Sequence, residues 1–537
     1  MTQGSRWVLG LFVLLTGCFE LEVDIITFGT DASEPGDPGK SDVRFTLDAK
    51  NDVRLISPYI YGFNDNISVI GNNTAALHFG TNRISAYNWE NNASNSGSEF
   101  GNVNDAAYCV FPDNPPAAPI EEYLIYDVDL IAIAIPINDY VAADYDIGGD
   151  VTSSPDYLHT RFKENRPTKD AAFSLEPDLT DDFVYQDELV NWVKARAGDK
   201  HVMFSLDDDV DKWDEIHPAI RPKGKLTFDE LIERNNDYAE AIKETWPEAD
   251  VGGFVGKTWL GLATLNMDIT REDPLIVERY VQTMREKSTA YGRRLIDYLE
   301  VRFFPQVYFD SDVNNPEMNA EVRMQSPREL WDETYTDTLD AETKAWLGDD
   351  VGLAYISRLK KVIAENDPEL KLLISSWGFG GDNHISGAIA LADTLGIFGR
   401  DGVDAAMNFD MFISDETARQ YLYAGFRMFR NFDGNMSCFG NISFRAVTDD
   451  VDQTSVYASY DADDPDRVVI VAINKAASSL TAGITIAHDT IFTRLSVYVL
   501  DDTGADIVAG QAVGAVDRNA FRYEMPPRSV SVLLPAK

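Results

Sequence analysis

The segment Leu124-Ile-Tyr-Asp-Val-Asp-Leu-Ile-Ala-Ile-Ala-Ile-Pro-Ile137 is a nearly unbroken run of Ile, Leu, Ala and Val. A run of this kind is typical of a buried strand. Similar runs follow at 202–206, 295–304, 370–376 and 405–409 and alternate with amphipathic helical segments. This alternation predicts a parallel α/β architecture over about 53–435, and we interpret it as a (β/α)8 TIM barrel. Periodicity alone also fits an open doubly wound sheet.

The clearest helix is predicted over 228–246. Its apolar residues recur at the helical period of 3.6 residues: Phe228, Leu231, Ile232, Tyr238 and Ile242. Thr227 can cap its N-terminus, Glu230 completes a capping box, and Pro247 ends the helix.

The pattern changes after about residue 438. Short runs of period 2 replace the helices at 455–460, 468–473, 495–500 and 530–534, with turn residues between them. This spacing predicts an antiparallel β-sandwich over 438–537, to which the early segment 43–56 can add a strand. The barrel domain is then predicted over 43–437.

The N-terminus has the features of a targeting segment. Arg6 precedes an apolar run, Trp7–Leu15, that is too short to span a bilayer. The run ends in Leu15-Thr-Gly-Cys18, which resembles a bacterial lipoprotein box, although an ordinary signal peptide with a chance cysteine fits as well. We therefore expect a signal peptide over 1–18, lipidation of Cys18 and a flexible tether over 19–42. The expected location is the bacterial cell envelope, with the protein lipid-anchored at the outer membrane or cell surface.

Charge and cysteine usage exclude several function classes. The 537 residues carry a net charge of −43, which repels phosphate backbones and argues against nucleic-acid binding but does not hinder binding of a neutral polysaccharide. The chain contains neither a CxxC nor an HExxH motif, so we predict no metal and no cofactor. Cys109 and Cys438 can pair in an oxidising compartment, but the sequence does not show whether they meet.

Four unusual segments carry a family resemblance: Ile56–Gly62, Asn82–Gly97 with Tyr87-Asn-Trp-Glu-Asn-Asn92, Ser205–Pro218, and Gly380–Arg400 with Gly380-Gly-Asp-Asn-His-Ile-Ser-Gly387. Together they resemble glycoside hydrolase family 44, the endo-β-1,4-glucanases and xyloglucanases. The likeness covers about 43–537 and implies a (β/α)8 barrel with a β-sandwich. It also implies a polysaccharide of the β-1,4-glucan type as the partner.

The resemblance locates two catalytic positions. The family's acid/base glutamate lies in a stretch resembling SLDNEP, which here reads Ser205-Leu-Asp-Asp-Asp-Val210 and has Asp209 at that position. The family's nucleophilic glutamate lies in a stretch resembling ITEYNYGG, which here reads Ile374-Ser-Ser-Trp-Gly-Phe-Gly-Gly381 and has Ser376 there. A retaining glycosidase needs two carboxyl groups that flank the scissile bond. Aspartate is shorter than glutamate by one carbon–carbon bond of about 1.5 Å, and a serine hydroxyl without a base is a poor nucleophile. The resemblance therefore implies a divergent member in which both catalytic glutamates are replaced.

The family-like segments also imply a glycan-binding groove. Its expected residues are Asn64, Asn82, Tyr87 and Asn88 as hydrogen-bonding partners, Trp89 and Trp331 as stacking faces, and His384 as a loop residue that shapes the cleft. Core packing of the tryptophans and turn capping by the polar residues are the alternative interpretations. Two other positions depart from the family, where Arg302 replaces a histidine and His78 replaces an arginine.

Three further interpretations of the acidic and nucleophilic residues remain. The spacing of Asp207, Asp209 and Asp211 invites a calcium loop, but Lys212 and Pro218 occupy its glycine and glutamate positions. Ser376 with His384 could form a nucleophile and base, although no nucleophile elbow surrounds Ser376.

An inverting acid pair is the third interpretation. Asp209 could act with Asp382 or Glu99, and Glu90 is a further nearby carboxylate.

Three functions follow from this sequence. The leading hypothesis is binding of β-1,4-linked glucan or a related polysaccharide with weak or no hydrolysis. The second is an active endo-β-1,4-glycanase with a rearranged acid pair, and the third is a non-carbohydrate scaffold at the cell surface.

Overall fold

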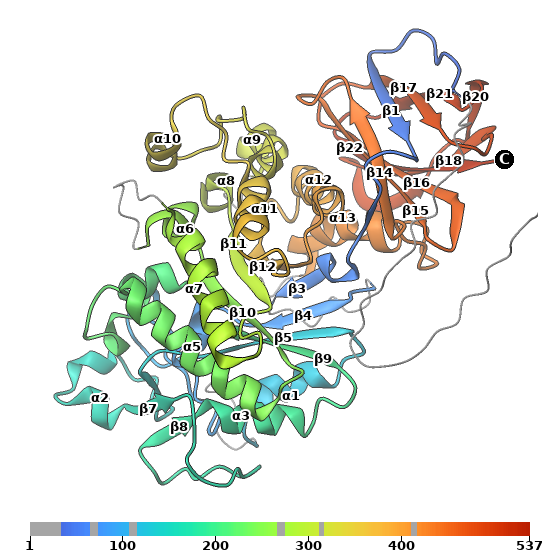
Figure 1. The fold of residues 1–537 in the computed structure, drawn as a ribbon. Coiled ribbons are helices and arrows are strands. Elements are labelled where there is room, and N and C mark those ends of the chain that lie inside the picture. The colour runs from blue at the N-terminus through green and yellow to red at the C-terminus, as the bar shows by residue number, and fades with distance from the viewer. Residues whose placement is uncertain (1–33, 65–72, 107–114, 266–273, 311–315, 410–415) are drawn as a thin grey trace, which may run out of the picture.

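The computed structural model describes residues 34–64, 73–106, 115–265, 274–310, 316–409 and 416–537. The predicted signal peptide, Cys18 and Cys109 lie outside these residues. Within them, the chain forms a barrel of parallel strands surrounded by helices, with a β-sandwich beside it (Figure 1). None of the helices in the described ranges combines the length and the apolar character that crossing a bilayer requires.

Eight parallel strands form the closed barrel: β3 (Gly62–Asn64), β4 (Ala76–Phe79), β5 (Leu130–Ile135), β9 (His201–Leu206), β10 (Asp250–Gly256), β11 (Tyr298–Phe303), β12 (Lys371–Trp377) and β13 (Ala405–Phe409). The ring closes because β13 pairs with β3, where Met407 lies opposite Gly62. This closure confirms the predicted TIM barrel and excludes the open sheet.

The five strands predicted from apolar runs are present, four of them with shifted ends and β13 with the predicted ends. The largest shift is in the run 124–137, of which only 130–135 forms β5, because helix α1 (Ala118–Leu124) ends at the first residue of the run and residues 125–129 connect the helix to the strand. Strands β3, β4 and β10 were not predicted. The first two have only three and four residues, and β10 carries three glycines, which weaken the signal of an apolar strand.

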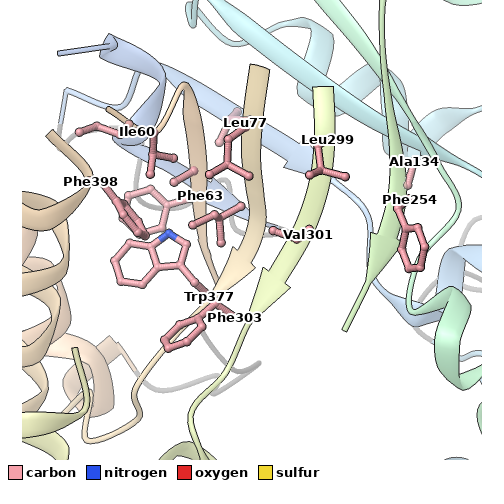
Figure 2. Packing of buried hydrophobic residues seen from close by; sticks show 14 of the residues in the cluster. Ile60, Phe63, Leu77, Ala134, Phe254, Leu299, Val301, Phe303, Trp377 and Phe398 are labelled. Carbon is pink, nitrogen blue, oxygen red and sulfur yellow. The ribbon is translucent and has the colours of Figure 1, made fainter. Parts of the chain in front are cut away.

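Alternate side chains of the strands point into the barrel and outward against the helices. The interior layer consists of Ala76, Leu130, Ala132, Met203, Tyr298, Leu373, Ala405 and Met407. Figure 2 shows part of the outer layer, in which Leu77, Val301 and Trp377 pack in one cluster with Phe398. Burial of each large apolar side chain stabilises the fold by about 1.5–3 kcal/mol. The strand ends are therefore held from both sides.

The remaining helices are α2 (Tyr157–Thr160), α3 (Gln186–Lys194), α4 (Trp213–Ile216), α5 (Phe228–Thr245), α6 (Trp259–Thr264), α7 (Ile276–Tyr291), α8 (Gln306–Asp310), α9 (Ala320–Gln325), α10 (Ala341–Leu347), α11 (Tyr355–Asn366), α12 (Ile385–Asp401) and α13 (Gln420–Arg430). Helix α5 begins as predicted, since the Thr227 hydroxyl accepts a hydrogen bond from the Glu230 N–H at 3.2 Å. The Glu230 carboxylate turns to Arg221 and Arg234 rather than completing the predicted capping box. A small separate sheet consists of β6 (Tyr140–Ala142), β7 (Phe162–Arg166) and β8 (Phe183–Tyr185).

The C-terminal strands form the predicted β-sandwich, which also includes two early strands. Its members are β1 (Val43–Asp48), β2 (Arg54–Leu55), β14 (Ile442–Thr448), β15 (Thr454–Asp461), β16 (Asp464–Asn474), β17 (Leu480–Ala487), β18 (Arg494–Asp501), β19 (Gly504–Ala509), β20 (Val513–Asp517), β21 (Ala520–Met525) and β22 (Ser529–Ala536). Strand β1 lies parallel to β17 and antiparallel to β14, and its Phe45 and Leu47 are fully buried in the sandwich core. Residues 43–48 therefore belong to the sandwich and not to the barrel domain predicted over 43–437.

The described end of the predicted tether is held against the sandwich. The Gly36 N–H donates to the Arg518 carbonyl at 2.6 Å. The Asp42 N–H donates to the Thr481 carbonyl at 2.9 Å, and the Thr481 N–H donates to the Asp42 carboxylate at 2.8 Å. Any flexible tether therefore ends before residue 36.

Helix α12 joins the barrel to the sandwich. A buried ion pair crosses the junction, where Lys475 Nζ lies 2.7 Å from Asp393 Oδ2 and both side chains are 2% exposed. The Tyr457 hydroxyl donates to the other Asp393 oxygen at 2.6 Å. Gly396 lets the Tyr457 ring approach the helix, since a β-carbon there would lie 2.2 Å from a ring carbon.

We predict that Lys475→Ala destabilises the protein by about 3–5 kcal/mol, because it leaves the Asp393 charge buried without its cation. Urea unfolding followed by tryptophan fluorescence measures the change. Lys361→Ala is the matched control, since Lys361 faces an exposed Glu365 at 3.9 Å and its loss should cost less than about 1 kcal/mol. Equal effects of the two substitutions would contradict the role assigned to the junction pair.

Candidate functional site

The carboxyl ends of the eight strands meet at one end of the barrel, the place where (β/α)8 proteins carry their sites. A cavity of about 560 Å³ opens there. Its walls include Lys257 and Trp259, which follow β10, Arg302 and Phe304 at the end of β11, and Glu99 from a loop after β4. This cavity is the candidate functional site, which we call the mouth cavity.

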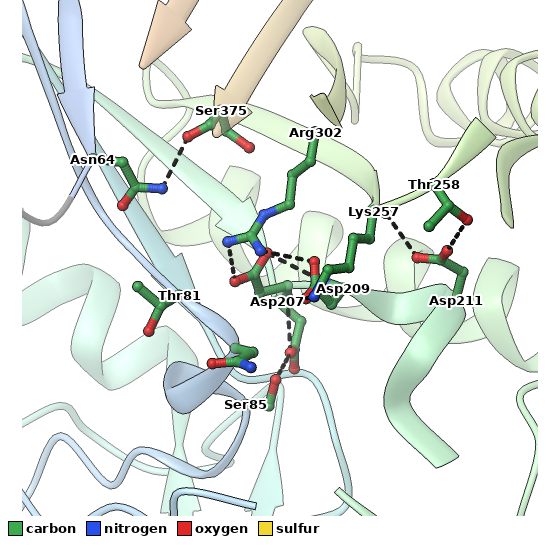
Figure 3. A network of polar contacts seen from close by, with 12 residues as sticks. Asn64, Thr81, Ser85, Asp207, Asp209, Asp211, Lys257, Thr258, Arg302 and Ser375 are labelled. Carbon is green, nitrogen blue, oxygen red and sulfur yellow. Dashed lines mark hydrogen bonds and ion pairs between the residues drawn. The ribbon is translucent and has the colours of Figure 1, made fainter. Parts of the chain in front are cut away.

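A buried network of ion pairs forms one side of the mouth cavity (Figure 3). Arg302 Nη1 lies 2.8 Å from Asp209 Oδ1, and Arg302 Nη2 lies 2.5 Å from Asp208 Oδ2. Lys257 Nζ lies 3.0 Å from the other Asp209 oxygen. Two cations thus face two carboxylates. Both Asp209 oxygens are engaged by a cation.

The network sets the protonation of its carboxyl groups. Burial by itself raises the pKa of Asp209, but the charges of Arg302 and Lys257 outweigh burial and hold that pKa below its usual range. Burial raises the pKa of Asp208 above its usual range, with the Arg302 charge opposing and the Asp209 charge adding to the rise. Asp209 is therefore an anion at neutral pH. A general acid must carry a proton, so this state opposes that role.

The backbone before Asp209 is fixed by Asp207. Both residues have positive φ, 69° and 45°, in the left-handed region that few side chains adopt without support. The Asp207 carboxylate accepts hydrogen bonds from the Ser85 hydroxyl at 2.5 Å, the Ile137 N–H at 2.7 Å and the Trp213 indole N–H at 3.2 Å. Asp207 therefore anchors the turn that aims Asp209.

The carboxylates considered for a calcium loop take separate partners. Asp211 accepts from the Lys257 N–H at 2.7 Å and the Thr258 hydroxyl at 2.9 Å, whereas Asp207 accepts from Ser85, Ile137 and Trp213. In the part of the chain that the structure describes, no three His, Cys, Asp or Glu side chains converge as a metal site.

A β-bulge at the end of β12 sets the direction of Ser376. The register with β11 shifts there, so that Val301 pairs with Ile374 and Arg302 pairs with Ser376. Paired residues on neighbouring parallel strands share a face, which gives Ser376 the same face as Arg302. The Ser376 hydroxyl is buried and has no hydrogen-bond partner among the described residues. Neighbouring Ser375 accepts a hydrogen bond at its carbonyl from Asn64 at 3.0 Å.

His384 does not serve as a base for Ser376. Its Nδ1 lies 2.8 Å from the Ser386 hydroxyl, and its Nε2 lies 2.9 Å from the Glu317 carboxylate. Burial lowers the His384 pKa. His384 thus caps the N-terminus of α12 and links that helix to the loop before α9.

A polar layer beneath Arg302 contains His78, which the sequence singled out, and Glu300, which it did not. Glu300 is fully buried, and burial raises its pKa to about 7 against the effects of the Ser375 and Ser205 hydroxyls and the Arg302 charge. His78 Nε2 lies 3.3 Å from the Ser205 hydroxyl, and burial followed by the Arg302 charge lowers the His78 pKa to about 3. The sequence did contain a signal for this layer. Glu300 and Arg302 are two charged residues spaced by two in an otherwise apolar strand, and that spacing puts both on one face.

Two of the predicted binding residues lie at the mouth of the barrel. Asn64 belongs to β3 and reaches β12 through its bond to Ser375. The Asn82 side chain donates to Glu99, which lines the mouth cavity, at 2.9 Å. His217 also reaches this corner, with its Nε2 2.5 Å from the Asn82 carbonyl.

Four predicted residues lie elsewhere. Tyr87, Asn88 and Trp89 are at most 1% exposed, and the Trp89 indole N–H donates to the Tyr185 carbonyl at 3.1 Å. These three side chains support the loop from inside and present no face to a sugar. Trp331 lies between the barrel and the sandwich, where it lines a different cavity.

The sequence also missed an aromatic cluster at the barrel mouth. The ring centroids of Phe304 and Tyr308 are 4.9 Å apart, and those of Phe304 and Phe409 are 6.0 Å apart. All three rings are half-buried, so each retains accessible surface. Gly378, just after β12, leaves room for Tyr308, since a β-carbon there would lie 3.1 Å from the ring. Their segments come from different strands, and no local pattern connects them.

The carboxylates considered for an inverting pair are not equivalent. Glu99 lines the mouth cavity together with Arg302 and Lys257, whereas Asp382 and Glu90 do not. Glu90 is buried, and burial raises its pKa to about 8 despite Lys163 at 3.6 Å.

This chain resembles known glycoside hydrolases in sequence. The sequence profile of glycoside hydrolase family 44 matches residues 76–307. A beta-mannanase/endoglucanase A of Caldicellulosiruptor saccharolyticus is 32% identical over an alignment 519 positions long, which covers 90% of this chain and 38% of that protein. Endoglucanase A of Paenibacillus lautus is 33% identical over an alignment 516 positions long, which covers 91% of this chain and 72% of that protein. The chain thus spans well under half of the first relative and most of the second.

Two solved structures extend the likeness to the whole fold. A Paenibacillus polymyxa xyloglucanase of this family, determined with xyloglucan, superimposes with a TM-score of 0.83 at 29% identity over 92% of this chain and 99% of that one. Cel44A, a family 44 endoglucanase from Clostridium thermocellum, gives a TM-score of 0.83 at 29% identity over 93% and 100% of the two chains. With its parallel barrel, its sandwich and a relative one-third identical over nearly its entire length, the chain belongs to glycoside hydrolase family 44.

Proposed function

We propose that this protein binds a β-1,4-linked glucan or a related polysaccharide at the mouth of its barrel and hydrolyses it weakly or not at all. One arrangement carries the proposal. Asp209 is held as an anion between Arg302 and Lys257, while Ser376 faces the same site from the end of β12. The proposal involves no metal and no cofactor.

The acid step is weakened by the ion pairs of Asp209. A leaving glycosidic oxygen must receive a proton in the transition state, and a positioned acid contributes about 10²- to 10⁴-fold to the rate. Arg302 and Lys257 favour the anionic form of Asp209 and occupy both of its oxygens. Protonating Asp209 would break these contacts within a buried cluster.

The covalent step lacks its nucleophile if position 376 aligns with the family glutamate. The retaining reaction needs a carboxylate on the far side of the sugar from the acid. Ser376 has a buried hydroxyl with no base within hydrogen-bond distance among the described residues. A neutral hydroxyl also provides no negative charge to stabilise an oxocarbenium ion.

Glycan binding does not depend on the missing carboxylate. Aromatic rings stack on the C–H faces of sugars, and Phe304, Tyr308 and Phe409 surround the end of β12. A cavity of about 560 Å³ beside them is in the range of small-molecule sites. The relative solved with xyloglucan supports a glucan-type ligand.

We predict that the wild-type protein is retarded by xyloglucan in native gels but releases reducing ends at the background rate. The triple variant Asp209→Glu/Ser376→Glu/Arg302→His should release them at least about 10²-fold faster, because it supplies an acid, a nucleophile and a smaller partner for the acid. A reducing-end assay on xyloglucan and carboxymethylcellulose measures both proteins.

The control for that gain is Asp209→Glu/Ser375→Glu/Arg302→His. It carries the same substitutions with the second glutamate one residue earlier, at the extra residue of the bulge. It should remain inactive. Rapid turnover by the wild type would overturn the proposal, and a lack of retardation by any glucan would overturn its binding half.

We predict that Arg302→Met destabilises the protein most at neutral pH. The depressed pKa of Asp209 contributes stability above the unfolded pKa of about 3.9, and this contribution is lost as the pH falls through the folded value. Removing Arg302 leaves buried carboxylates that cost several kcal/mol until they are protonated. Because the Asp209 contribution of the wild type is fully present above about pH 3.9, the difference in melting temperature between variant and wild type should narrow from pH 7 toward 4 through protonation of the buried carboxylates in the variant, and narrow further below pH 3.9 as the wild type loses its own contribution.

The exposed Arg445, which lies 3.4 Å from Asp52, gives the matched substitution Arg445→Met. Its effect should be small at every pH. A difference for Arg302→Met that does not change with pH would show that Asp209 is not held as an anion by this contact.

We propose that the protein acts at the bacterial cell envelope, anchored through lipid on Cys18. The motif Leu15-Thr-Gly-Cys18 supports this proposal, and acyl chains on a cysteine hold a protein at a membrane by burying methylene groups.

Expressed in a bacterium from the full-length gene, the protein should sediment with the membranes and incorporate labelled palmitate. Cys18→Ser should abolish both. Labelling that persists in Cys18→Ser would contradict the anchor.

The second candidate is an active endo-β-1,4-glycanase with a rearranged acid pair. It is favoured by Glu99, which lines the mouth cavity beside Lys257 and Arg302. If the wild type does release reducing ends, this candidate requires that Glu99→Gln and Asp209→Asn each abolish the release.

A further inference from the structure

A second cavity, of about 290 Å³, lies at the junction of the barrel and the sandwich. The barrel contributes Trp331 and Arg400, and most of the remaining wall comes from strands β14 and β15 and the turn between them. Among the residues that the structure describes, none lines both this junction cavity and the mouth cavity. The two are therefore separate sites.

Trp331 is held rigidly in the wall of the junction cavity. It follows directly on a short 3₁₀ helix, Ser326–Leu330, and its backbone N–H donates to the Arg328 carbonyl at 3.1 Å. The guanidinium of Arg400 lies 4.8 Å from the centroid of its ring, and both oxygens of Asp401 fix that guanidinium at 2.7 and 2.8 Å. A ring that is already immobilised loses little conformational entropy when a ligand stacks on it.

The cations around the junction cavity are all paired. Arg400 pairs with Asp401, and Arg445 lies 3.4 Å from Asp52. Lys475 pairs with Asp393, as described for the junction. An anionic ligand would therefore find no unpaired cation here. A neutral ligand rich in hydroxyl groups does not need an unpaired cation, because its hydroxyl groups can both donate to and accept from the polar groups of the wall.

Hydroxyl groups border the remaining wall. Thr448 and Ser455 line the cavity at partly exposed positions, whereas Thr454 is buried, with its hydroxyl 2.6 Å from that of Thr448 and donating to the Asp450 carbonyl at 2.7 Å. Phe444 and Tyr457 also line the cavity but are buried, so Trp331 is the accessible aromatic side chain of its wall. An aromatic face bordered by hydroxyl groups matches the two kinds of surface on a pyranose ring, which has C–H faces and a hydroxyl edge.

We propose that the junction cavity is a second binding site that takes a sugar ring of a neutral β-linked glucan, with Trp331 as its stacking face. The ligand class rests on the proposed function of the mouth, whereas the site itself rests on the geometry of the junction. The site takes part in no chemistry. It holds polysaccharide independently of the mouth cavity.

The test uses two tryptophans as separate reporters, since Trp259 lines the mouth cavity and Trp331 lines the junction cavity. The full-length protein is labelled with 5-fluorotryptophan and followed by ¹⁹F NMR, with Trp259→Phe and Trp331→Phe assigning the two signals. Cellohexaose and a xyloglucan heptasaccharide are the probes, and hexagalacturonate is the anionic comparison. We expect saturable shifts of the Trp331 signal with the two neutral probes and no shift with hexagalacturonate.

Ser455→Tyr provides the control, because it fills the junction cavity from β15. It should abolish the shift of Trp331 and leave the titration of Trp259 unchanged, which also shows that the variant is folded. If Trp259 responds and Trp331 does not, the junction site is overturned and the mouth proposal stands. If only Trp331 responds, binding at the mouth is overturned. A Trp331 shift that survives Ser455→Tyr, or that only hexagalacturonate produces, also overturns the junction site.

Discussion

The guanidinium of Arg302, buried between the carboxylates of Asp208 and Asp209, is the interaction on which the mouth of the barrel depends. Charges of this kind are tolerated in a protein interior only when each is paired. Lys257 completes the balance by neutralising the second oxygen of Asp209. The cluster fixes the end of β9 against β10 and β11, and it holds Asp209 in a single ionisation state.

The same balance constrains position 376. Ser376 shares the face of Arg302 because of the bulge in β12. A glutamate at this place would add a further carboxyl group to a buried cluster that already holds Asp208, Asp209 and Glu300, and burial already raises the pKa of Asp208 and Glu300. A serine is electrically compatible with this network.

The β-sandwich packs directly against the barrel through helix α12. Helix α12 is buried along nearly its whole length between the two, and the Asp393–Lys475 pair and the Tyr457 ring lock it in place. The first described residues of the chain also belong to the sandwich, through β1 and its bonds to β14 and β17. This arrangement makes the junction rigid, and a rigid junction can hold an aromatic face such as that of Trp331 in a fixed position.

The sequence by itself determined the α/β architecture with a following β-sandwich, and through the family resemblance it predicted Asp209 and Ser376 at the two catalytic positions. Alternating apolar strands and amphipathic helices encode a parallel α/β fold because burial of apolar side chains has local periods of two and 3.6 residues, whereas the closure of the sheet into a barrel is seen in the pairing of β13 with β3. The family-like segments then assigned Asp209 and Ser376 without any coordinates. Tertiary structure decided what surrounds them. Contacts between distant segments decide three features: the pairing of Arg302 and Lys257 with Asp209, the burial of Trp89, and the position of Trp331 at the junction instead of the mouth. Ion pairing and burial arise only where the closed barrel brings separate strands together. A local sequence pattern does not show which distant segments will be in contact.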